Sequence, residues 1–346
     1  MEHMKQILHY IGVDFHPYEQ TVAYVSDGDG EIKFCQFRHS DKKGIRRFYR
    51  QFGNQTEIGV EATGSLYWFE KMLEEEGHRL KIGNPQKIRK MALSSHKNDF
   101  RDAKTILELL VTGRFPLIER RSEKSQTVLQ MMNYRHFLVK KRTAVGNGLQ
   151  AFARRKGLEK FRTQARLAKE KLFAAVDNPE EEFLVASRYA LFKYLDEEIQ
   201  KIDPELEKEA RGNDRPKLLM THSGVGPLTA LAVIHTLGDV NRFSRKEQVV
   251  AFIGLDPLDK SSGQRKRIGQ ISKEGSRLAR FLLIQAAQAT KDKRLKAFYK
   301  RVSRRRGNQK AKVAAARKLL INCYIMLRDE INYQEFCRRG EVGLCE

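Results

Sequence analysis

The sequence predicts an α/β domain at its N-terminal end, then a long helical arm, then a mainly helical C-terminal domain. Three observations lead to this prediction. Short apolar strands alternate with helical segments over residues 1–115. Charged residues alternate with Leu, Phe and Met, with little Gly or Pro, over 116–212. Apolar helices separated by turns follow over 213–332, and we expect 333–346 to be a loose tail.

The N-terminal domain has the strand and helix order of a known fold class. Apolar or alternating stretches predict three meandering strands at 6–14, 21–26 and 32–37, with a hairpin turn over 27–30. Alternating segments follow: a helix at 41–52, a strand at 56–61, a helix at 66–76, a strand at 79–83 and helices through 112. This order is typical of an RNase H-like α/β domain, in which helices cover a mixed sheet.

Four acidic residues stand where that fold would bring them together. Asp14 ends the first strand, Glu61 ends the fourth, and Asp99 and Asp102 open a later helix. If the first and fourth strands are parallel neighbours, their ends meet at one edge of the sheet. Four carboxylates there suit two Mg²⁺ ions (or Mn²⁺) in phosphoryl transfer, since hard cations prefer oxygen ligands.

Each of these acids also has an ordinary structural explanation. Asp14 could be a strand-end turn residue, and Glu61 could cap the helix that follows Gly64. Asp99 could be a helix N-cap, with Asp102 as a first-turn acid that favours the helix dipole. We favour the metal site because all four acids fall at the places that it requires.

The positive charge is concentrated near the C-terminal end. The chain has a net charge of +23, yet residues 1–113 hold 17 Lys+Arg against 16 Asp+Glu, whereas 260–318 hold 20 against 2. Such a stretch repels itself unless a polyanion lies nearby, and it lacks the sustained apolar face of a membrane-surface helix, so nucleic acid is favoured. The residues expected to contact it, unless they form only a solvated face, are Arg265, Lys266, Arg267, Lys273, Arg277, Arg280, Arg304 and Arg305.

Composition argues against two other classes of protein. No apolar run approaches the length of a membrane span, and residues 1–10 lack a signal-peptide core. The four cysteines have no metal-finger spacing. We therefore expect a cytoplasmic protein with reduced thiols and no membrane partner.

The arm and the C-terminal domain leave several interpretations open. Long helices at 130–153 and 180–206 could form a coiled-coil dimer, dock RNA or only separate two domains, and 211–215 is the expected linker. The turn at 223–227 is either a helix-hairpin-helix phosphate site or a plain packing unit. We predict further helices at 244–253, 273–289 and 311–327.

A polar loop holds a candidate nucleophile. Ser261 and Ser262 precede Gly263 and the basic run Arg265–Arg267. A serine hydroxyl attacks phosphorus well only when it is deprotonated and the phosphate charge is neutralised, and neighbouring cations supply the second condition. Spacing alone does not separate this role from an ordinary Ser-Gly loop.

Taken together, these motifs resemble those of a known family over nearly the whole chain. The motifs, in chain order, are Ile11-Gly-Val-Asp14, Val60-Glu-Ala-Thr-Gly64, Asn98-Asp-Phe-Arg-Asp-Ala103, Ser223-Gly-Val-Gly-Pro227, Ala251-Phe-Ile-Gly-Leu-Asp-Pro257, Ser262-Gly263 and Ile271-Ser-Lys-Glu-Gly275. The set resembles the DEDD-type insertion-sequence transposases of the "insertion sequence one-ten" family, the bridge-RNA-guided serine recombinases. The resemblance is specific because two unrelated groups of motifs agree.

The resemblance implies a RuvC-like DEDD catalytic domain at 1–115, a coiled-coil arm at 116–212 and a transposase domain at 213–332. It implies that Asp14, Glu61, Asp99 and Asp102 bind Mg²⁺, and that Ser262 joins covalently to DNA, with Ser261 as the alternative. Its implied partners are the element ends, the target DNA and a structured noncoding bridge RNA. The protein would form homodimers that assemble into tetramers, and it would associate with the prokaryotic nucleoid.

Two alternatives belong to other functional classes. A RuvC-like endonuclease or junction resolvase would use water as the nucleophile, and Ser262 would then be structural. A nucleic-acid-binding protein without chemistry would need none of the four acids. The loop after Gly263 is also more basic than the family pattern suggests, which bears on strand contacts and not on the reaction class.

Overall fold

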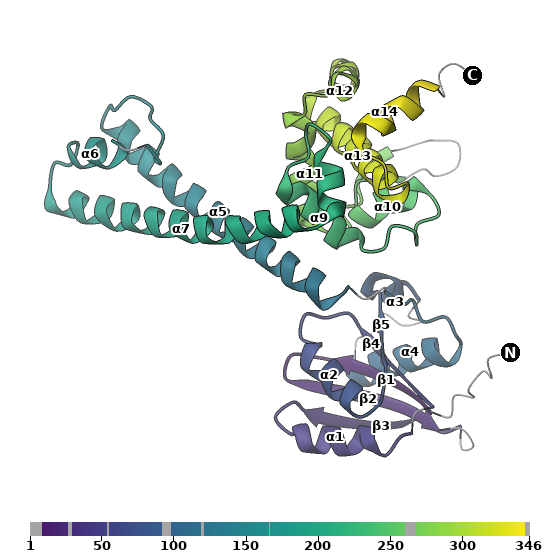
Figure 1. The fold of residues 1–346 in the computed structure, drawn as a ribbon. Helices are drawn as coiled ribbons and strands as arrows, with labels where there is room; N and C mark the ends of the chain where they lie inside the picture. Colours follow the sequence, from purple (N-terminus) through teal and green to yellow (C-terminus); the bar gives the residue numbers. More distant parts are fainter. Residues whose placement is uncertain are drawn as a thin grey trace. The chain divides into compact units, whose positions relative to one another are not determined.

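The computed structural model describes residues 9–26, 30–53, 55–91, 98–118, 121–165, 167–259 and 268–342. The chain divides into two compact units, Met1–Arg120 and Arg121–Glu346, called unit 1 and unit 2 below (Figure 1). Unit 1 is a mixed α/β structure, and the described part of unit 2 is helical apart from one short antiparallel pair of strands.

Unit 1 is built on a five-stranded sheet of order β3-β2-β1-β4-β5. Strand β1 is antiparallel to β2 and β2 to β3, whereas β1 is parallel to β4 and β4 to β5. The antiparallel order of the first three strands is confirmed, and the first and fourth strands are the parallel neighbours that the metal-site argument required; residues 27–29 of the predicted hairpin turn lie outside the described residues. The elements of unit 1 are β1 (His9–Phe15), β2 (Glu19–Ser26), β3 (Lys33–Arg38), α1 (Lys42–Arg50), β4 (Thr56–Glu61), α2 (Tyr67–Glu75), β5 (Leu80–Gly83), α3 (Pro85–Met91) and α4 (Asp99–Val111).

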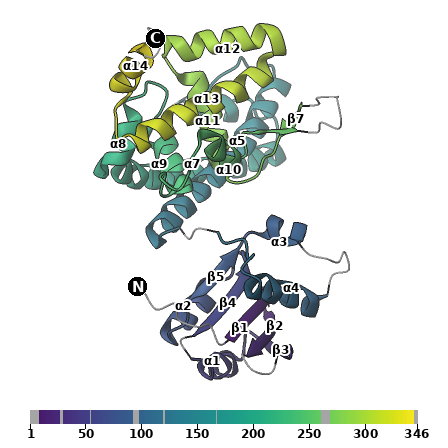
Figure 2. The ribbon, with the colours of Figure 1, turned by 90° about the vertical axis from the view of Figure 1, so that its right-hand side faces the viewer.

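Helices cover both faces of this sheet (Figure 2). On one face, Ile11, Val13 and Phe15 of β1 join the core that α1 and α2 complete. On the other face, Tyr10 of β1 packs with the buried side of α4, as alternation along a strand requires.

Two glycines let α4 lie close against the sheet. Gly12 of β1 is the register partner of Gly59 of β4. A Cβ atom on Gly12 would stand 2.4 Å from the Ala103 carbonyl oxygen and 2.5 Å from the Leu107 nitrogen, and one on Gly59 would stand 2.7 Å from a methyl of Leu110. Larger residues here would displace the helix that carries Asp99 and Asp102.

Unit 2 contains the long helices and the main hydrophobic core. Its elements are α5 (Glu123–Arg155), α6 (Ala168–Phe173), α7 (Pro179–Gly212), α8 (Asp214–Met220), α9 (Pro227–Leu237), α10 (Lys246–Ile253), β6 (Pro257–Asp259), β7 (Ile268–Ile271), α11 (Arg277–Ala289), α12 (Lys293–Arg306), α13 (Asn308–Arg328) and α14 (Tyr333–Val342). Strands β6 and β7 form an antiparallel pair.

Helices α5 and α7 pack along each other and form the predicted arm, with α6 at its far end (Figure 1). The ion pairs Arg135–Asp203 and Arg142–Asp196 join the two helices beside an apolar seam of Leu138, Leu195 and Ile199. Coiled-coil dimerisation of this arm stays a prediction.

Several predicted boundaries differ from the structure. Helix α7 runs to Gly212 and α8 starts at Asp214, so the expected linker 211–215 reduces to Asn213. The Asn213 side chain accepts a hydrogen bond from the Arg215 nitrogen, which caps α8 without a longer connection. The segment 333–346, expected to be a loose tail, contains α14, because Tyr333 and Phe336 pack on the main core.

Helix α11 also starts later than its predicted residue 273. Ser276 caps the helix through the Ala279 nitrogen, and Lys273 has a positive φ of 57°, which lies outside a right-handed helix. Within the described residues, no helix is both long and apolar enough to cross a membrane.

Candidate metal centre

The carboxyl ends of β1 and β4 bring two of the predicted acids to one edge of the sheet. Val13 is the register partner of Val60, and Asp14 and Glu61 follow these residues directly. Gly12 and Gly59, two residues earlier, face α4. Because side chains alternate along a strand, Asp14 and Glu61 are directed to the same face as α4.

Helix α4 begins beside this edge, and its capping leaves Asp99 available. Asn98, not Asp99, is the N-cap, since its side chain accepts a hydrogen bond from the Phe100 nitrogen at 3.0 Å. The alternative that Asp99 serves as the cap is therefore wrong. Asp99 and Asp102 occupy the first turn, where the helix dipole favours negative charge.

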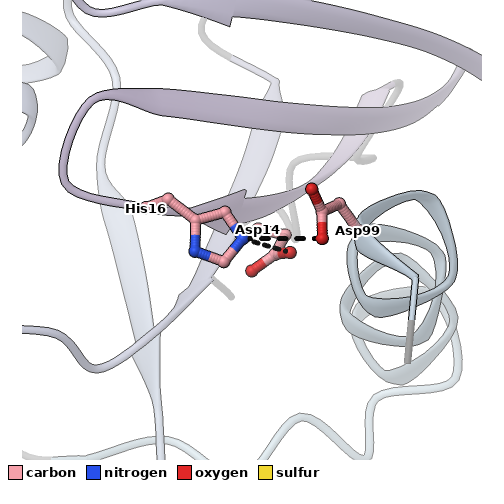
Figure 3. A group of neighbouring side chains, drawn as sticks. All are labelled: Asp14, His16 and Asp99. Atoms are coloured by element: carbon pink, nitrogen blue, oxygen red, sulfur yellow. Dashed lines mark ion pairs between the residues drawn. The ribbon is translucent and has the colours of Figure 1, made fainter. Parts of the chain in front are cut away.

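His16 completes a compact group with two of the acids (Figure 3). Its Nε2 atom lies 3.2 Å from Asp14 Oδ2 and 3.7 Å from Asp99 Oδ1. One ligand atom from each of Asp14, His16 and Asp99 lies within 4.8 Å of the others. The side chains of His16 and Asp99 are 45% and 48% exposed, so solvent and solutes reach the group.

Asp14 is the buried member of the group, with a side chain only 15% exposed. Burial raises the pKa of its carboxyl to about 6; His16 opposes the rise, and Asp102 and Asp99 add to it. Its Oδ2 atom is buried and, within the described residues, accepts no hydrogen bond of good geometry. A buried acceptor among further acids fits a bound cation, which would supply the missing positive charge.

The other two predicted acids stand outside this compact group. Glu61 is 32% exposed, and its Oε1 lies 3.6 Å from Nη2 of Arg89. Asp102 affects Asp14 through its charge. The structure thus brings Asp14 and Asp99 into one group with His16. Glu61 lies nearby at the end of β4, and Asp102 lies in the same first turn of α4 as Asp99.

Sequence reasoning did not single out His16, although a signal for it exists. Residues two apart at a strand end point to the same side, so Asp14-Phe-His16 already places an imidazole beside the acid. His16 stands one residue beyond β1, and its backbone nitrogen donates to the Glu19 carbonyl at 2.9 Å, which closes the turn into β2.

The predicted nucleophile lies outside the described residues. Both candidate serines, Ser261 and Ser262, lie outside them, and so do the basic residues Arg265, Lys266 and Arg267. The described chain on either side forms the β6–β7 pair, and beyond β7 the Ser272 hydroxyl donates to Asp256 Oδ1.

The described basic residues of the C-terminal stretch have different surroundings. Lys273, Arg277, Arg304 and Arg305 are candidates for nucleic-acid contact, the last two in the final turn of α12. Arg280 is half-buried, and its Nη1 atom lies within hydrogen-bond distance of the carbonyls of residues 253, 274 and 275. Those contacts tie α11 to the end of α10 and to the loop that precedes α11.

The turn between α8 and α9 packs closely inside unit 2. A Cβ atom on Gly224 would stand 2.7 Å from the Ala286 carbonyl oxygen and 2.7 Å from Cβ of Thr290. The Ser223 hydroxyl accepts a hydrogen bond from the Lys291 nitrogen. These contacts account for the glycine by packing alone, and a phosphate site in this turn stays a prediction.

Comparison with known proteins finds a transposase family match in each half of the chain. Residues 216–300 match the family described as "Transposase IS116/IS110/IS902 family", and residues 11–155 match the DEDD transposase family of the IS110 type, described as "Transposase".

Individual relatives show the same similarity. The chain is 30% identical over 292 residues to a probable family 20 transposase of Pseudomonas aeruginosa, covering 82% of this chain and 81% of the relative. It is 31% identical over 266 residues to the transposase for insertion sequence element IS1111A of Coxiella burnetii, covering 74% and 72%. The transposase for insertion sequence element IS1328 of Yersinia enterocolitica is 28% identical over 268 residues, 73% of this chain and 78% of the relative. The chain therefore belongs to the IS116/IS110/IS902 family of transposases.

Proposed function

We propose that this transposase cuts and rejoins DNA at the ends of its insertion sequence through a covalent phosphoserine link. Unit 1 would be an RNase H-like, RuvC-like domain whose acids hold Mg²⁺ or Mn²⁺. Ser262 would be the nucleophile, and a bridge RNA would select the donor and target strands. The supporting observation is that the largely buried carboxylate of Asp14 lies in one group with Asp99 and His16, at the carboxyl edge of β1 and β4.

The four acids would hold the cations in two ways. Asp14 is mostly buried and directly follows Val13, the register partner of Val60, so it would be the central ligand that the sheet holds rigidly. Glu61, Asp99 and Asp102 are more exposed or lie on a helix turn, and they would complete the ligand set. The bound cations would neutralise phosphate oxygens and lower the pKa of an attacking hydroxyl.

In the serine step one phosphoester bond would form for each one that breaks. The Ser262 oxygen would attack a DNA phosphorus and form a serine–phosphate ester, while one phosphorus–deoxyribose oxygen bond breaks. The deoxyribose oxygen would leave as a strand-end hydroxyl and take up the proton that the serine loses. A hydroxyl of a second strand would reverse the step, release Ser262 and form the recombinant bond without external energy.

The basic stretch 260–318 would bind the phosphate backbones of DNA and of the RNA. The described candidates for these contacts are Lys273, Arg277, Arg304 and Arg305. Arg280 is committed to three backbone carbonyls and would support the surface more than it touches phosphate. A dimer that assembles into a tetramer would let the serine of one subunit reach the acids of another.

A covalent-trapping experiment tests the serine. The purified chain, DNA containing the element end, the RNA transcribed beside the element and Mg²⁺ would be mixed, denatured and digested. We expect a nucleotide on the peptide that contains Ser261 and Ser262, with fragmentation placing it on Ser262. Ser262→Ala should abolish the adduct and strand cleavage, and Ser261→Ala is the matched control that should retain both.

Other outcomes identify the competing functions. Metal-dependent nicking without an adduct, retained in Ser262→Ala, would favour a RuvC-like endonuclease that uses water. DNA binding without any strand cleavage, equal in the unaltered protein and in Asp14→Asn, would identify a nucleic-acid-binding protein, whereas loss of metal-dependent cleavage in Asp14→Asn would exclude that function. An adduct on Ser261 would move the nucleophile by one residue and keep the reaction.

A further inference from the structure

We infer that His16 is itself a metal ligand, so that the centre in unit 1 binds its cation through one imidazole nitrogen together with Asp14 and Asp99. This inference rests on the proposed metal function of the acids and adds a nitrogen donor to an otherwise all-oxygen ligand set. It implies that the centre binds Mn²⁺ in preference to Mg²⁺.

Geometry is the first support. His16 Nε2 faces both carboxylates, 3.2 Å from an oxygen of Asp14 and 3.7 Å from an oxygen of Asp99, and all three ligand atoms lie within 4.8 Å of one another. Figure 3 shows the other ring nitrogen directed away from both acids. Neutral imidazole, bound through one of its two nitrogens, is the commonest metal ligand among protein side chains.

The backbone around His16 holds the ring in place. Its nitrogen donates to the Glu19 carbonyl at 2.9 Å, and Pro17 follows directly and restricts the chain. His39 braces the same turn from the end of β3, since its backbone nitrogen donates to the Tyr18 carbonyl at 2.7 Å and its Nδ1 lies 3.2 Å from the Pro17 carbonyl. A ligand on a braced turn loses little conformational entropy when the cation binds.

The ligand chemistry sets the expected ion preference. Mg²⁺ takes oxygen ligands almost exclusively and holds its waters tightly, whereas Mn²⁺, a first-row transition metal that also suits carboxylates, accepts an imidazole nitrogen more readily. A centre with two carboxylates and one imidazole should therefore bind Mn²⁺ more tightly than Mg²⁺. Removal of the imidazole should weaken Mn²⁺ binding more than Mg²⁺ binding.

The test uses the full chain with Mn²⁺ alone, so it needs neither DNA nor activity. Pulsed electron paramagnetic resonance of bound Mn²⁺ detects directly coordinated nitrogen, and labelling histidine with ¹⁵N changes that signal. We expect the histidine nitrogen signal in the unaltered protein. In His16→Gln we expect its loss and at least about tenfold weaker Mn²⁺ binding, with a smaller change for competing Mg²⁺.

A matched control comes from the same strand. His9 stands on the opposite face of β1, where its ring packs against Phe52, so His9→Gln should keep the nitrogen signal and the Mn²⁺ affinity. Thermal unfolding in chelator checks that both variants fold, and His16→Asn repeats the test with a shorter amide.

The outcomes separate this inference from the function on which it rests. Mn²⁺ that binds without a histidine nitrogen signal, and is lost in Asp14→Asn but not in His16→Gln, would overturn the ligand role of His16 and keep the acid site. A nitrogen signal that persists in His16→Gln would also overturn it. Failure of the unaltered protein to bind Mn²⁺ at all would overturn both.

Discussion

The carboxylate charge of Asp14 is destabilised by its surroundings, and a bound cation would remove that destabilisation. The sheet buries its carboxyl beside two further acids, and His16 alone does not offset the burial, which raises the pKa to about 6. At neutral pH the carboxyl is still mostly ionised, but its charged form is less stable in the metal-free folded protein than in the unfolded chain. Such a destabilised charge marks a ligand site more than a stabilising contact.

This destabilisation predicts how stability changes in Asp14→Asn. The folded pKa lies above the ordinary aspartate pKa of 3.8, so the folded state binds the proton more tightly. The resulting stabilisation is full below about pH 4, falls as pH rises toward about 6 and is then absent, because the unfolded chain ionises first. In chelator at pH 7.5, Asp14→Asn should raise the free energy of unfolding by about 1–2 kcal/mol, a value reduced for partial exposure.

Thermal or urea unfolding at pH 4 and 7.5, with chelator and with Mn²⁺, measures this effect. We expect little difference between the two proteins at pH 4. With Mn²⁺ at pH 7.5 the order should reverse, because only the unaltered protein gains stability from the ion. A variant that is less stable than the parent in chelator at pH 7.5 would mean that Asp14 makes favourable contacts of its own.

The contact between α4 and the sheet sets the position of two acids. Gly12 and Gly59 leave room for the helix backbone, and Asn98 starts that helix so that Asp99 falls beside β1. The helix could not lie at this distance over a strand with larger side chains. The centre therefore depends on residues that have no ligand atoms.

Gly12→Ala tests this dependence. The added Cβ would meet backbone atoms at 2.4 and 2.5 Å, so α4 must shift, and we expect a loss of stability of about 1–3 kcal/mol. We expect Mn²⁺ affinity to fall as well, because Asp99 moves with the helix. Gly53→Ala is the matched control, since a Cβ there meets nothing within 4 Å. Unchanged affinity in Gly12→Ala would show that the helix position does not set the centre.

The charge of the whole molecule predicts a binding surface on unit 2. Of the basic residues expected to bind nucleic acid, Lys273, Arg277, Arg304 and Arg305 are the described candidates, whereas Arg280 is bound to carbonyls. Affinity for DNA should fall by roughly 0.9 log units per phosphate contact for each tenfold rise in salt. A flat salt dependence would exclude this surface as the phosphate contact.

Two sets of variants distinguish the arginines that contact phosphate from the arginine that stabilises the fold beneath this surface. Arg304→Gln with Arg305→Gln should reduce the salt slope by about 0.9 for each phosphate that the variant no longer neutralises, and should leave the melting temperature unchanged. Arg280→Gln should lower the melting temperature, because three carbonyls lose a charged donor. Titration of labelled DNA by fluorescence anisotropy at several salt concentrations, with parallel melting curves, measures both effects.

Periodicity and turn chemistry were enough to predict much of this molecule. The strands of the meander and the long helices of the arm follow from patterns that are local in the chain, whereas the parallel pairing of β1 with β4 was assumed from the fold class that their order indicates. Those patterns also place Asp14 and Glu61 at strand ends. Local hydrogen bonds and side-chain alternation act over a few residues, so a sequence pattern reports them directly.

Tertiary packing was needed for the remainder. That His16 and Asp99 approach Asp14 and that Arg280 binds carbonyls both depend on how the elements assemble. The cap of α4 by Asn98 rather than Asp99 is a local hydrogen bond, but the sequence offers both residues as caps and only the geometry of the turn separates them. Helix α14 is likewise ordered by the core on which Tyr333 and Phe336 pack, although its sequence resembles a loose tail. Burial and close approach are properties of the assembled elements, because the same local pattern is compatible with several arrangements until the elements pack.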